Sequence, residues 1–267
     1  MVQLTDRGQW APAGLIVDMD GVLYRGGTAL PGLAEFASVS AAWPRVLLTN
    51  NSTVSAADCA RKLWQLGAPV PEQQILTVSG AMAAFLAAEL APGTSVYVIG
   101  DRPLRAAVAE AGLTEGGRDP AAVVVGLDRD LRYQQLAEAT RLLRRGCPLI
   151  ATSLDPVLLT ADGAVPGTGV IVAALRACAE AEPVCVGKPA PRFFRSAIRR
   201  LQLPAGSVLT IGDSLSADIA GGNAAGTHTA LMLSGVTSAP PPANATARPD
   251  YVFTSLPELT AFLRSCR

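Results

Sequence analysis

Short apolar runs that favour β-strands alternate with helical patterns along most of the sequence. The expected strands are residues 14–18, 45–49, 95–100, 121–126, 148–152, 183–187, 207–212, 228–233 and 250–253. The expected helices are residues 31–42, 55–66, 79–90, 102–112, 131–146, 168–181, 190–202 and 216–225. A strand followed by a helix and another strand builds a parallel sheet with helices on its faces. The alternation therefore predicts an α/β protein.

The composition narrows the class of protein further. Of the 267 residues, 49% are hydrophobic and 16% are charged, which suits a globular chain and not a disordered one. Acidic and basic residues number 22 each without a basic block, so we expect no nucleic-acid partner. We expect no membrane partner either, because no apolar run approaches the roughly 18 residues of a span. Scattered cysteines and a beginning without a signal-peptide pattern predict a cytoplasmic protein.

Two aspartates, Asp18 and Asp20, stand at the end of the first of these strands, in Asp18-Met19-Asp20-Gly21-Val22. Side chains at alternate positions of a strand point to the same side, so two carboxylates there repel unless a cation or a phosphate joins them. An Asp-Gly turn after a strand is also common for structural reasons alone. The functional interpretation makes Asp18 a nucleophile and Asp20 its acid/base partner.

Three more polar clusters each follow an expected strand. Their members are Thr49 with Asn50, then Lys188, and then Asp213 and Ser214 with Asp218 beyond them. Each has a structural alternative when it is taken alone: a turn at Thr49, a surface position for Lys188 and a helix N-cap at Asp213. The carboxyl ends of parallel strands lie at one edge of a sheet, however, so the four clusters are expected to converge.

Such a set suits phosphoryl transfer, which needs a nucleophile, an acid/base, a charge-neutralising clamp and usually a magnesium ion. Asp18 would attack phosphorus and form an aspartyl-phosphate. Asp20 would protonate the leaving oxygen and then activate the water that breaks the intermediate. The expected phosphate-binding residues are Thr49, Asn50, Lys188 and Ser214.

The carboxylates also predict a Mg²⁺ site, because Mg²⁺ prefers oxygen ligands. The expected ligands are Asp213, one carboxylate oxygen of Asp18 and a backbone carbonyl near Asp20. Asp218 would lie behind them and orient water or Lys188. One divalent ion together with Lys188 brings the charge of this cleft close to neutrality and leaves a place for a phosphate monoester.

The four clusters resemble the four motifs of the haloacid dehalogenase (HAD) superfamily. The runs Thr49-Asn50-Asn51-Ser52-Thr53, Pro166-Gly167-Thr168-Gly169 and Leu233-Ser234-Gly235-Val236-Thr237 resemble its NagD-like, p-nitrophenyl phosphatase branch. The resemblance extends from about Gly14 to Leu259. It implies a HAD-like doubly wound parallel sheet with an inserted α/β cap domain. It also implies a Mg²⁺-dependent phosphatase for a small phosphorylated metabolite, and it is compatible with a homodimer formed through the cap.

The spacing of the motifs places the extra sequence between the second and the third, so we expect a core at 1–78 and 183–267 and a cap at 79–182. The resemblance implies that the cap covers the active site and selects the leaving group. Candidate cap residues are Arg129, Asp155 and the turn Thr152-Ser153-Leu154. The chain departs from the family where Ser153-Leu154-Asp155 replaces Asn-Pro-Asp, and where Ala217 replaces a threonine.

Other interpretations stay open or fail on the same residues. A phosphomutase would keep the same motifs, and a catalytically silent Mg²⁺-dependent binding protein is a further alternative. A Ser-His-Asp hydrolase is disfavoured because the single histidine, His228, suits a structural role and no Gly-x-Ser-x-Gly occurs. The first strand also lacks the Gly-x-Gly-x-x-Gly of a dinucleotide site. Only two of the 22 basic residues are lysines, Lys62 and Lys188, and such a lysine can mark a place where a compact ammonium is needed. For Lys62, which lies on an expected helix, we prefer chance as the explanation of its presence.

Overall fold

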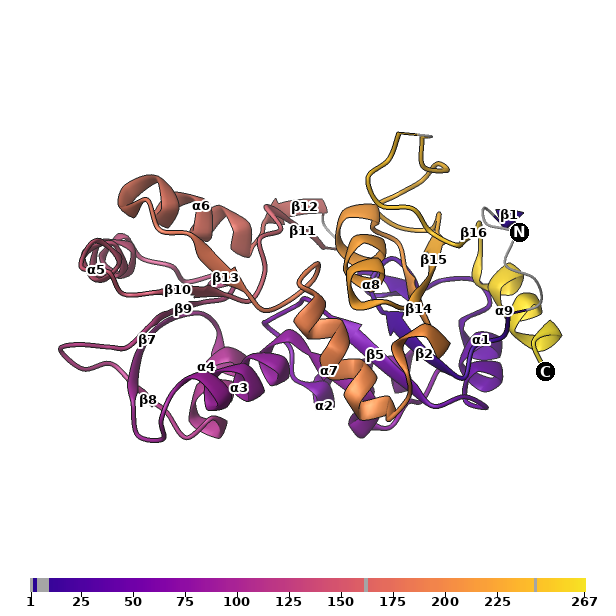
Figure 1. Cartoon of the computed structure of the whole chain (residues 1–267), viewed down its shortest axis with the longest axis horizontal. Helices are drawn as coiled ribbons and strands as arrows, with labels where there is room; N and C mark the ends of the chain where they lie inside the picture. The colour runs from indigo at the N-terminus through magenta and orange to yellow at the C-terminus, as the bar shows by residue number, and fades with distance from the viewer. Residues whose placement is uncertain (1, 4–9, 161–162, 243) are drawn as a thin grey trace. The chain divides into compact units, whose positions relative to one another are not determined.

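The computed structural model describes residues 2–3, 10–160, 163–242 and 244–267, and the chain divides into two compact units (Figure 1). The first unit contains Met1–Thr49, Ala56–Leu76 and Lys188–Arg267, and the second contains Asn50–Ser55 and Thr77–Gly187. The second unit is therefore longer at both ends than the cap expected at 79–182. One reason lies at its start, where the Thr77 side chain caps the first helix by accepting a hydrogen bond from Gly80 N at 3.1 Å.

A seven-stranded sheet forms the centre of the first unit. In spatial order its strands are β1 (Val2–Gln3), β16 (Tyr251–Phe253), β15 (His228–Met232), β14 (Val208–Gly212), β2 (Gly14–Asp18), β5 (Arg45–Thr49) and β6 (Ile75–Thr77). The strands from β16 to β5 are parallel, and β1 pairs antiparallel with β16. The chain extends the sheet away from β2 in both directions, which makes the fold a doubly wound α/β core.

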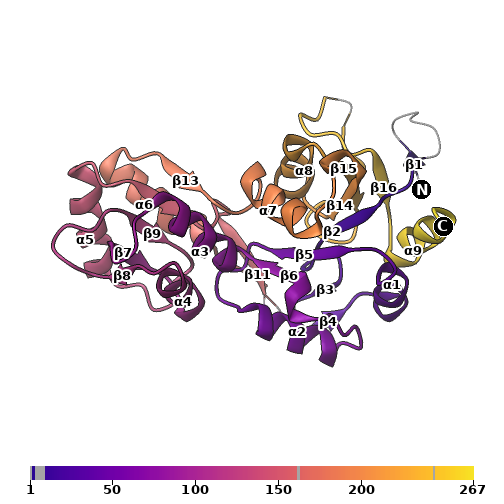
Figure 2. The ribbon, with the colours of Figure 1, turned by 60° about the horizontal axis from the view of Figure 1, so that its bottom comes forward.

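Helices cover both faces of this sheet (Figures 1 and 2). They are α1 (Leu33–Ser40), α2 (Ala56–Gln65), α7 (Pro191–Leu201), α8 (Ala220–Ala225) and α9 (Leu256–Ser265). Helices α7 and α8 pack together on one face, and α1 and α9 pack together on the other. The first contact is close because Gly221 has no side chain: a Cβ there would lie 2.1 Å from the Phe194 ring.

Short elements connect these layers. A hairpin of β3 (Tyr24–Arg25) and β4 (Thr28–Ala29) forms a flap after β2. Single 3₁₀ turns occur at Glu72–Gln74 and Ala205–Ser207. A π-helical turn at Leu215–Ile219 precedes α8, so the single helix expected at 216–225 has two parts.

The second unit has its own five-stranded parallel sheet. Its strands, in spatial order, are β13 (Pro183–Cys185), β10 (Leu149–Ala151), β9 (Val123–Val125), β7 (Ser95–Ile99) and β8 (Thr114–Glu115). Helices α3 (Val78–Glu89) and α4 (Arg102–Glu110) are in contact, as are α5 (Tyr133–Arg144) and α6 (Thr168–Ala179) on the opposite face of the sheet (Figure 1). A separate hairpin joins β11 (Val157–Thr160) to β12 (Gly163–Pro166).

One strand lies in a different sheet from the one expected. The sequence assigned residues 183–187 to the core, but β13 pairs with β10, with Leu149 opposite Pro183 and Ala151 opposite Cys185. The second unit therefore continues to Gly187. Its parallel neighbour β10 follows the same apolar, β-branched pattern, so local sequence alone does not tell which of two parallel sheets accepts such a strand.

Most other expected elements occur within a few residues of their predicted bounds. Elements that the sequence analysis did not anticipate are β1, β3, β4, β6, β8, β11, β12 and α9. The proline-rich segment 238–249 was expected to be a loop, and its described residues contain neither helix nor strand. Among the described residues, we find no helix with the length and apolar character of a membrane span.

Candidate active site

Three neighbouring parallel strands bring polar side chains to one edge of the core sheet. Asp18 is the last residue of β2 and lies opposite Leu48, so Thr49 at the end of β5 is one step beyond it. On the other side Val17 lies opposite Ile211, and Asp213 directly follows the end of β14. All three side chains are buried, with 8%, 6% and 4% exposure for Asp18, Thr49 and Asp213. Open α/β sheets form their binding sites at the carboxyl ends of such strands.

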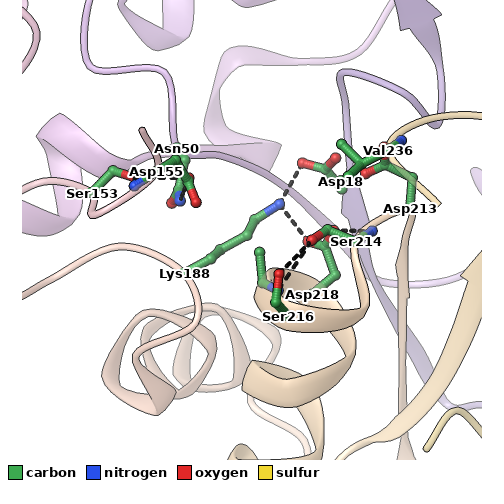
Figure 3. Close-up of polar contacts among 11 residues, drawn as sticks. Asp18, Asn50, Ser153, Asp155, Lys188, Asp213, Ser214, Ser216, Asp218 and Val236 are labelled. Atoms are coloured by element: carbon green, nitrogen blue, oxygen red, sulfur yellow. Dashed lines mark hydrogen bonds and ion pairs between the residues drawn. The ribbon is translucent and has the colours of Figure 1, made fainter. Parts of the chain in front are cut away.

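Lys188 supplies the positive charge at this edge (Figure 3). Its Nζ forms an ion pair with Asp18 Oδ1 and a second one with Asp218 Oδ1, at 2.6 Å for the latter. Lys188 reaches this position from the segment between β13 and α7, and not from the end of a core strand as the sequence suggested. The other carboxylate oxygen of Asp218, Oδ2, accepts a hydrogen bond from Ser214 N at 3.1 Å.

Burial and mutual charge govern how these groups titrate. Burial raises the pKa of Asp18 well above its ordinary value, and the charge of Lys188 opposes that rise. Burial alone would lower the pKa of Lys188, but the carboxylates of Asp18 and Asp218 raise it above its ordinary value. The ammonium of Lys188 is therefore held in its charged form between two carboxyl groups.

Asp213 lies in a narrow cradle of backbone. Its Oδ2 accepts a hydrogen bond from Val236 N at 2.6 Å, and its carbonyl oxygen accepts one from Thr237 N at 3.0 Å (Figure 3). Glycine is required on two sides, since a Cβ at Gly235 or Gly21 would lie only 1.8 or 2.2 Å from Asp213 Oδ2. Burial and the negative charge of Asp218 raise the pKa of Asp213 to about 6, while the Val236 amide opposes the rise.

The carboxylates suit a hard divalent cation. Among the described residues, one ligand oxygen from each of Asp18, Asp213 and Asp218 lies within 4.8 Å of the others. Oxygen donors of this kind are the ones that Mg²⁺ prefers. Asp218 is already bound to Lys188 and to Ser214 N, so Asp18 and Asp213 are the carboxylates best placed to hold a metal ion. The residues present therefore fit the Mg²⁺ that the sequence predicts.

Asp20 lies at the base of the flap. It forms a β-bridge with Tyr24, whose carbonyl oxygen accepts a hydrogen bond from Gly21 N at 2.8 Å. Gly21 has a φ of 85°, a left-handed conformation that favours glycine at this turn. The Asp20 side chain is exposed, but burial of part of its surface raises its pKa, and Lys62 and the amides of Gly26 and Gly21 oppose the rise.

Ser214 has a structural task in addition to the phosphate-binding role predicted for it. Its Oγ accepts a hydrogen bond from Ala217 N at 3.2 Å and so caps the π-helical turn that carries Asp218. Ser216 Oγ lies 3.3 Å from the same oxygen (Figure 3). The role of Ser214 in phosphate binding stays a prediction, as do the roles predicted for Thr49 and Asn50.

Asn50 belongs to the second unit, where it joins the predicted turn of the cap. Asp155 Oδ2 accepts hydrogen bonds from Asn50 Nδ2 at 3.1 Å and from Ser153 Oγ at 2.7 Å (Figure 3). Ser153 Oγ also accepts a hydrogen bond from Asp155 N at 3.0 Å, so this serine closes the turn. Thr152 is fully buried, and its Oγ1 has no hydrogen-bond partner among the described residues. Arg129 is exposed.

His228 lies apart from the site, at the opposite end of the core strands. It begins β15, and its Nδ1 is 3.5 Å from Asp250 Oδ2. Its ring packs against Trp10 with 3.9 Å between the ring centroids and an angle of 35° between the ring planes. These contacts agree with the structural role that the sequence suggested for this histidine.

Comparison with known proteins places the chain in a family. Residues 15–114 match the family model described as haloacid dehalogenase-like hydrolase, and residues 185–259 match the one described as HAD-hydrolase-like. The chain is 32% identical over 252 residues to the 5′-nucleotidase YutF of Bacillus subtilis, covering 94% of this chain and 98% of that protein. It is also 32% identical to the ribonucleotide monophosphatase NagD of Escherichia coli, covering 92% of this chain and 97% of NagD.

A solved structure shows the same fold. The glycerol phosphate phosphatase of Mycobacterium tuberculosis, in complex with magnesium, superposes with a TM-score of 0.87 and 34% sequence identity, covering 94% of this chain and 78% of that one. The doubly wound fold and the acidic edge of the core sheet define a hydrolase of the phosphoryl-transfer class. The chain belongs to the haloacid dehalogenase superfamily, within its NagD-like branch.

Proposed function

We propose that the protein is a Mg²⁺-dependent phosphatase that hydrolyses small phosphate monoesters through an aspartyl-phosphate on Asp18. The observation that carries the proposal is the buried arrangement of Asp18, Lys188, Asp213 and Asp218 at the carboxyl edge of the core sheet. The relatives support it, because those compared above are named as phosphatases or a nucleotidase that act on phosphorylated small molecules. A small phosphorylated metabolite is the substrate class that we propose.

The reaction takes place in two displacements. In the first, a carboxylate oxygen of Asp18 attacks phosphorus, and the bond from phosphorus to the ester oxygen breaks as Asp20 gives that oxygen its proton. In the second, Asp20 takes a proton from water, whose oxygen then attacks phosphorus and releases Asp18 and inorganic phosphate. Lys188 holds Asp18 in place through their ion pair, and Asp218 in turn holds Lys188.

The remaining groups bind and neutralise the substrate. Asp18 and Asp213, with the backbone carbonyl of Asp20, would hold the Mg²⁺ ion. That ion supplies positive charge that stabilises the phosphoryl oxygens as negative charge builds on them. Thr49, Asn50 and Ser214 are proposed to bind phosphoryl oxygens by hydrogen bonds. The backbone cradle around Asp213 fixes the orientation of that ligand before substrate arrives.

Removal of magnesium tests the proposal directly. We expect the purified protein to release inorganic phosphate from p-nitrophenyl phosphate and from members of a metabolite panel when Mg²⁺ is present. Chelation by EDTA is expected to lower the rate by at least about 100-fold, because the metal contributes several kcal/mol of charge stabilisation. Excess Mg²⁺ should restore the rate. Equal rates with and without EDTA would contradict the metal dependence.

The same assay separates the alternatives. A phosphomutase would convert one phosphate ester to another and release little inorganic phosphate, which the products reveal by ³¹P NMR. A catalytically silent binding protein would turn over nothing across the panel, yet would bind Mg²⁺ and a phosphate ester by calorimetry. The panel member with the highest kcat/KM nominates the substrate.

We also propose that two copies associate through the second unit. Large apolar side chains are exposed around its β11–β12 hairpin, with Val157 at 52%, Val170 at 44% and Leu154 at 42% exposure. A patch of this kind outside a core is typical of an interaction surface. Sedimentation equilibrium is expected to give twice the monomer mass of 27.5 kDa, and Val157→Asp is expected to lower it toward the monomer. A wild-type protein that sediments as a monomer at all concentrations would contradict this proposal.

The cytoplasm is the compartment that we propose for the reaction. All five cysteines are free thiols, which suits a reducing environment.

A further inference from the structure

Lys62 lies beside the flap that carries Asp20, although the sequence analysis preferred chance as the explanation for this lysine. It is on α2, and its Nζ lies 3.7 Å from the centroid of the Tyr24 ring. Figure 2 shows α2 next to the β3–β4 hairpin. An ammonium over an aromatic face is attracted by the ring, and the attraction is stronger where water is partly excluded.

Tyr24 connects this contact to the acid/base residue. It is buried, at 5% exposure, and it pairs with Asp20 in the β-bridge that closes the turn. Its carbonyl oxygen also accepts the hydrogen bond from Gly21 N. The ammonium of Lys62 therefore rests on the residue that fixes the backbone of Asp20.

The charge of Lys62 acts on the same carboxyl group. Lys62 is half-buried, and burial lowers its pKa, while the negative charge of Asp20 and then Cys59 oppose that change. On α2 itself, Asp58 forms an exposed ion pair with Arg61 at 2.9 Å. The contact of Lys62 with the Tyr24 ring joins this lysine to the flap.

We infer that Lys62 is a positioning residue for Asp20. The ammonium, held on the Tyr24 ring, attracts the exposed Asp20 carboxyl and keeps it in the orientation from which it delivers its proton to the leaving oxygen. This inference rests on the proposed phosphatase function, in which the electrons of the broken phosphorus–oxygen bond stay on that oxygen as it takes the proton of Asp20. It goes beyond that function because Lys62 is not one of the site residues that the sequence predicts.

The dependence on the leaving group tests this inference. A p-nitrophenolate leaves without a proton, whereas an alkoxide, such as that of glycerol phosphate, needs one. Loss of a general acid costs about 10²- to 10⁴-fold where the proton is needed. The parameter to compare is kcat/KM, because it covers the steps up to departure of the leaving group and not the later hydrolysis of the aspartyl-phosphate, in which Asp20 serves both substrates equally. We therefore expect Lys62→Met to lower kcat/KM for the alkyl phosphate by about 10-fold or more, and for p-nitrophenyl phosphate by less than about 3-fold.

Four further variants complete the design. Asp20→Asn is expected to show the same dependence on the leaving group with a larger effect. Lys62→Arg should restore most of the alkyl phosphatase rate, because a guanidinium also stacks on an aromatic ring and carries the charge. Arg61→Met, on the neighbouring exposed position of α2, is the matched control and should leave both rates unchanged. Lys62→Gln replaces Lys62→Met if that variant does not fold, as judged by circular dichroism.

The outcomes distinguish a failure of the positioning role of Lys62 from a failure of the proposed phosphatase function. Equal losses on both substrates, or no loss, in the Lys62 variants overturn the positioning role if Asp20→Asn still shows a leaving-group dependence. Failure of Lys62→Arg to recover activity also overturns it. If the wild-type protein hydrolyses neither ester in Mg²⁺, the proposed function fails and this inference fails with it.

Discussion

Asp18→Asn is expected to eliminate phosphate release, with a fall in kcat of roughly 10⁴-fold or more, because the amide cannot form the covalent bond to phosphorus. The substitution is nearly isosteric, and Lys188 keeps its ion pair with Asp218. Lys188 and Asp218 remain as a buried pair of opposite charge, and Asp213 keeps its hydrogen bond from Val236 N. We therefore expect the fold and the unfolding midpoint to stay close to those of the wild type. Phosphate release from p-nitrophenyl phosphate in Mg²⁺ measures the effect.

The matched control for this prediction is Asp58→Asn. Asp58 is an aspartate of the same unit, but its side chain is exposed and pairs with Arg61 on the surface of α2. We expect this control to keep the wild-type rate. A rate for Asp18→Asn above about 1% of the wild-type value would show that the nucleophile is another group.

The core of the fold could be predicted because its elements are long, apolar and regularly spaced. Strands β2 and β5 begin and end at the predicted residues, since each is a buried parallel strand that ends in a polar residue. Two-residue strands such as β3, β4 and β8 could not be predicted, because so few residues carry no periodicity. The strand β13 was predicted, but its sheet was not, because pairing partners are decided by packing and not by the strand's own pattern.

The candidate site was predictable where chemistry follows a strand directly. The sequence identified Asp18, Asp213 and Lys188 as one cluster, and the structure brings Lys188 within ion-pair distance of Asp18. The sequence marked the run from Leu233 to Thr237 only as a feature of the NagD-like branch. Its contact with Asp213, through Val236 N and Gly235, was not predicted, because a backbone amide donor has no signature in a sequence.

The role inferred for Lys62 could not be predicted from the sequence for a different reason. Its rarity as one of two lysines was visible, but its contact with Tyr24 depends on how α2 lies against the flap. Only the packed structure contains that information. The rarity of a residue type therefore indicates a role only when the structure also places that residue on a helix next to a catalytic loop.

Lys188→Met is expected to damage both activity and stability, which distinguishes it from Asp18→Asn. Lys188 is buried, at 4% exposure, and is paired with two carboxyl groups. Without it, Asp18 and Asp218 are buried next to each other with no cation, and removal of one partner from a buried pair costs about 3–5 kcal/mol. We expect a loss of that size in the free energy of unfolding, measured with urea in EDTA, and a fall in kcat of about 10³-fold.

The loss of stability in this variant should depend on pH. Burial already raises the pKa of Asp18 in the wild-type protein, and removal of the opposing Lys188 charge raises it further. A carboxyl whose pKa is higher in the folded than in the unfolded state binds its proton more tightly when folded, so the folded state gains stability as the pH falls. Lowering the pH from about 7.5 to about 5 should therefore recover part of the lost stability.

Two further variants identify the origin of the loss. Lys188→Arg keeps the charge and should retain more stability than Lys188→Met, although its planar group fits the site of a compact ammonium poorly. The double variant Lys188→Met/Asp218→Asn removes one uncompensated carboxylate, so it should regain stability without regaining activity. Wild-type stability of Lys188→Met at neutral pH would contradict this prediction, because it would mean that the variant buries no uncompensated pair of carboxylates.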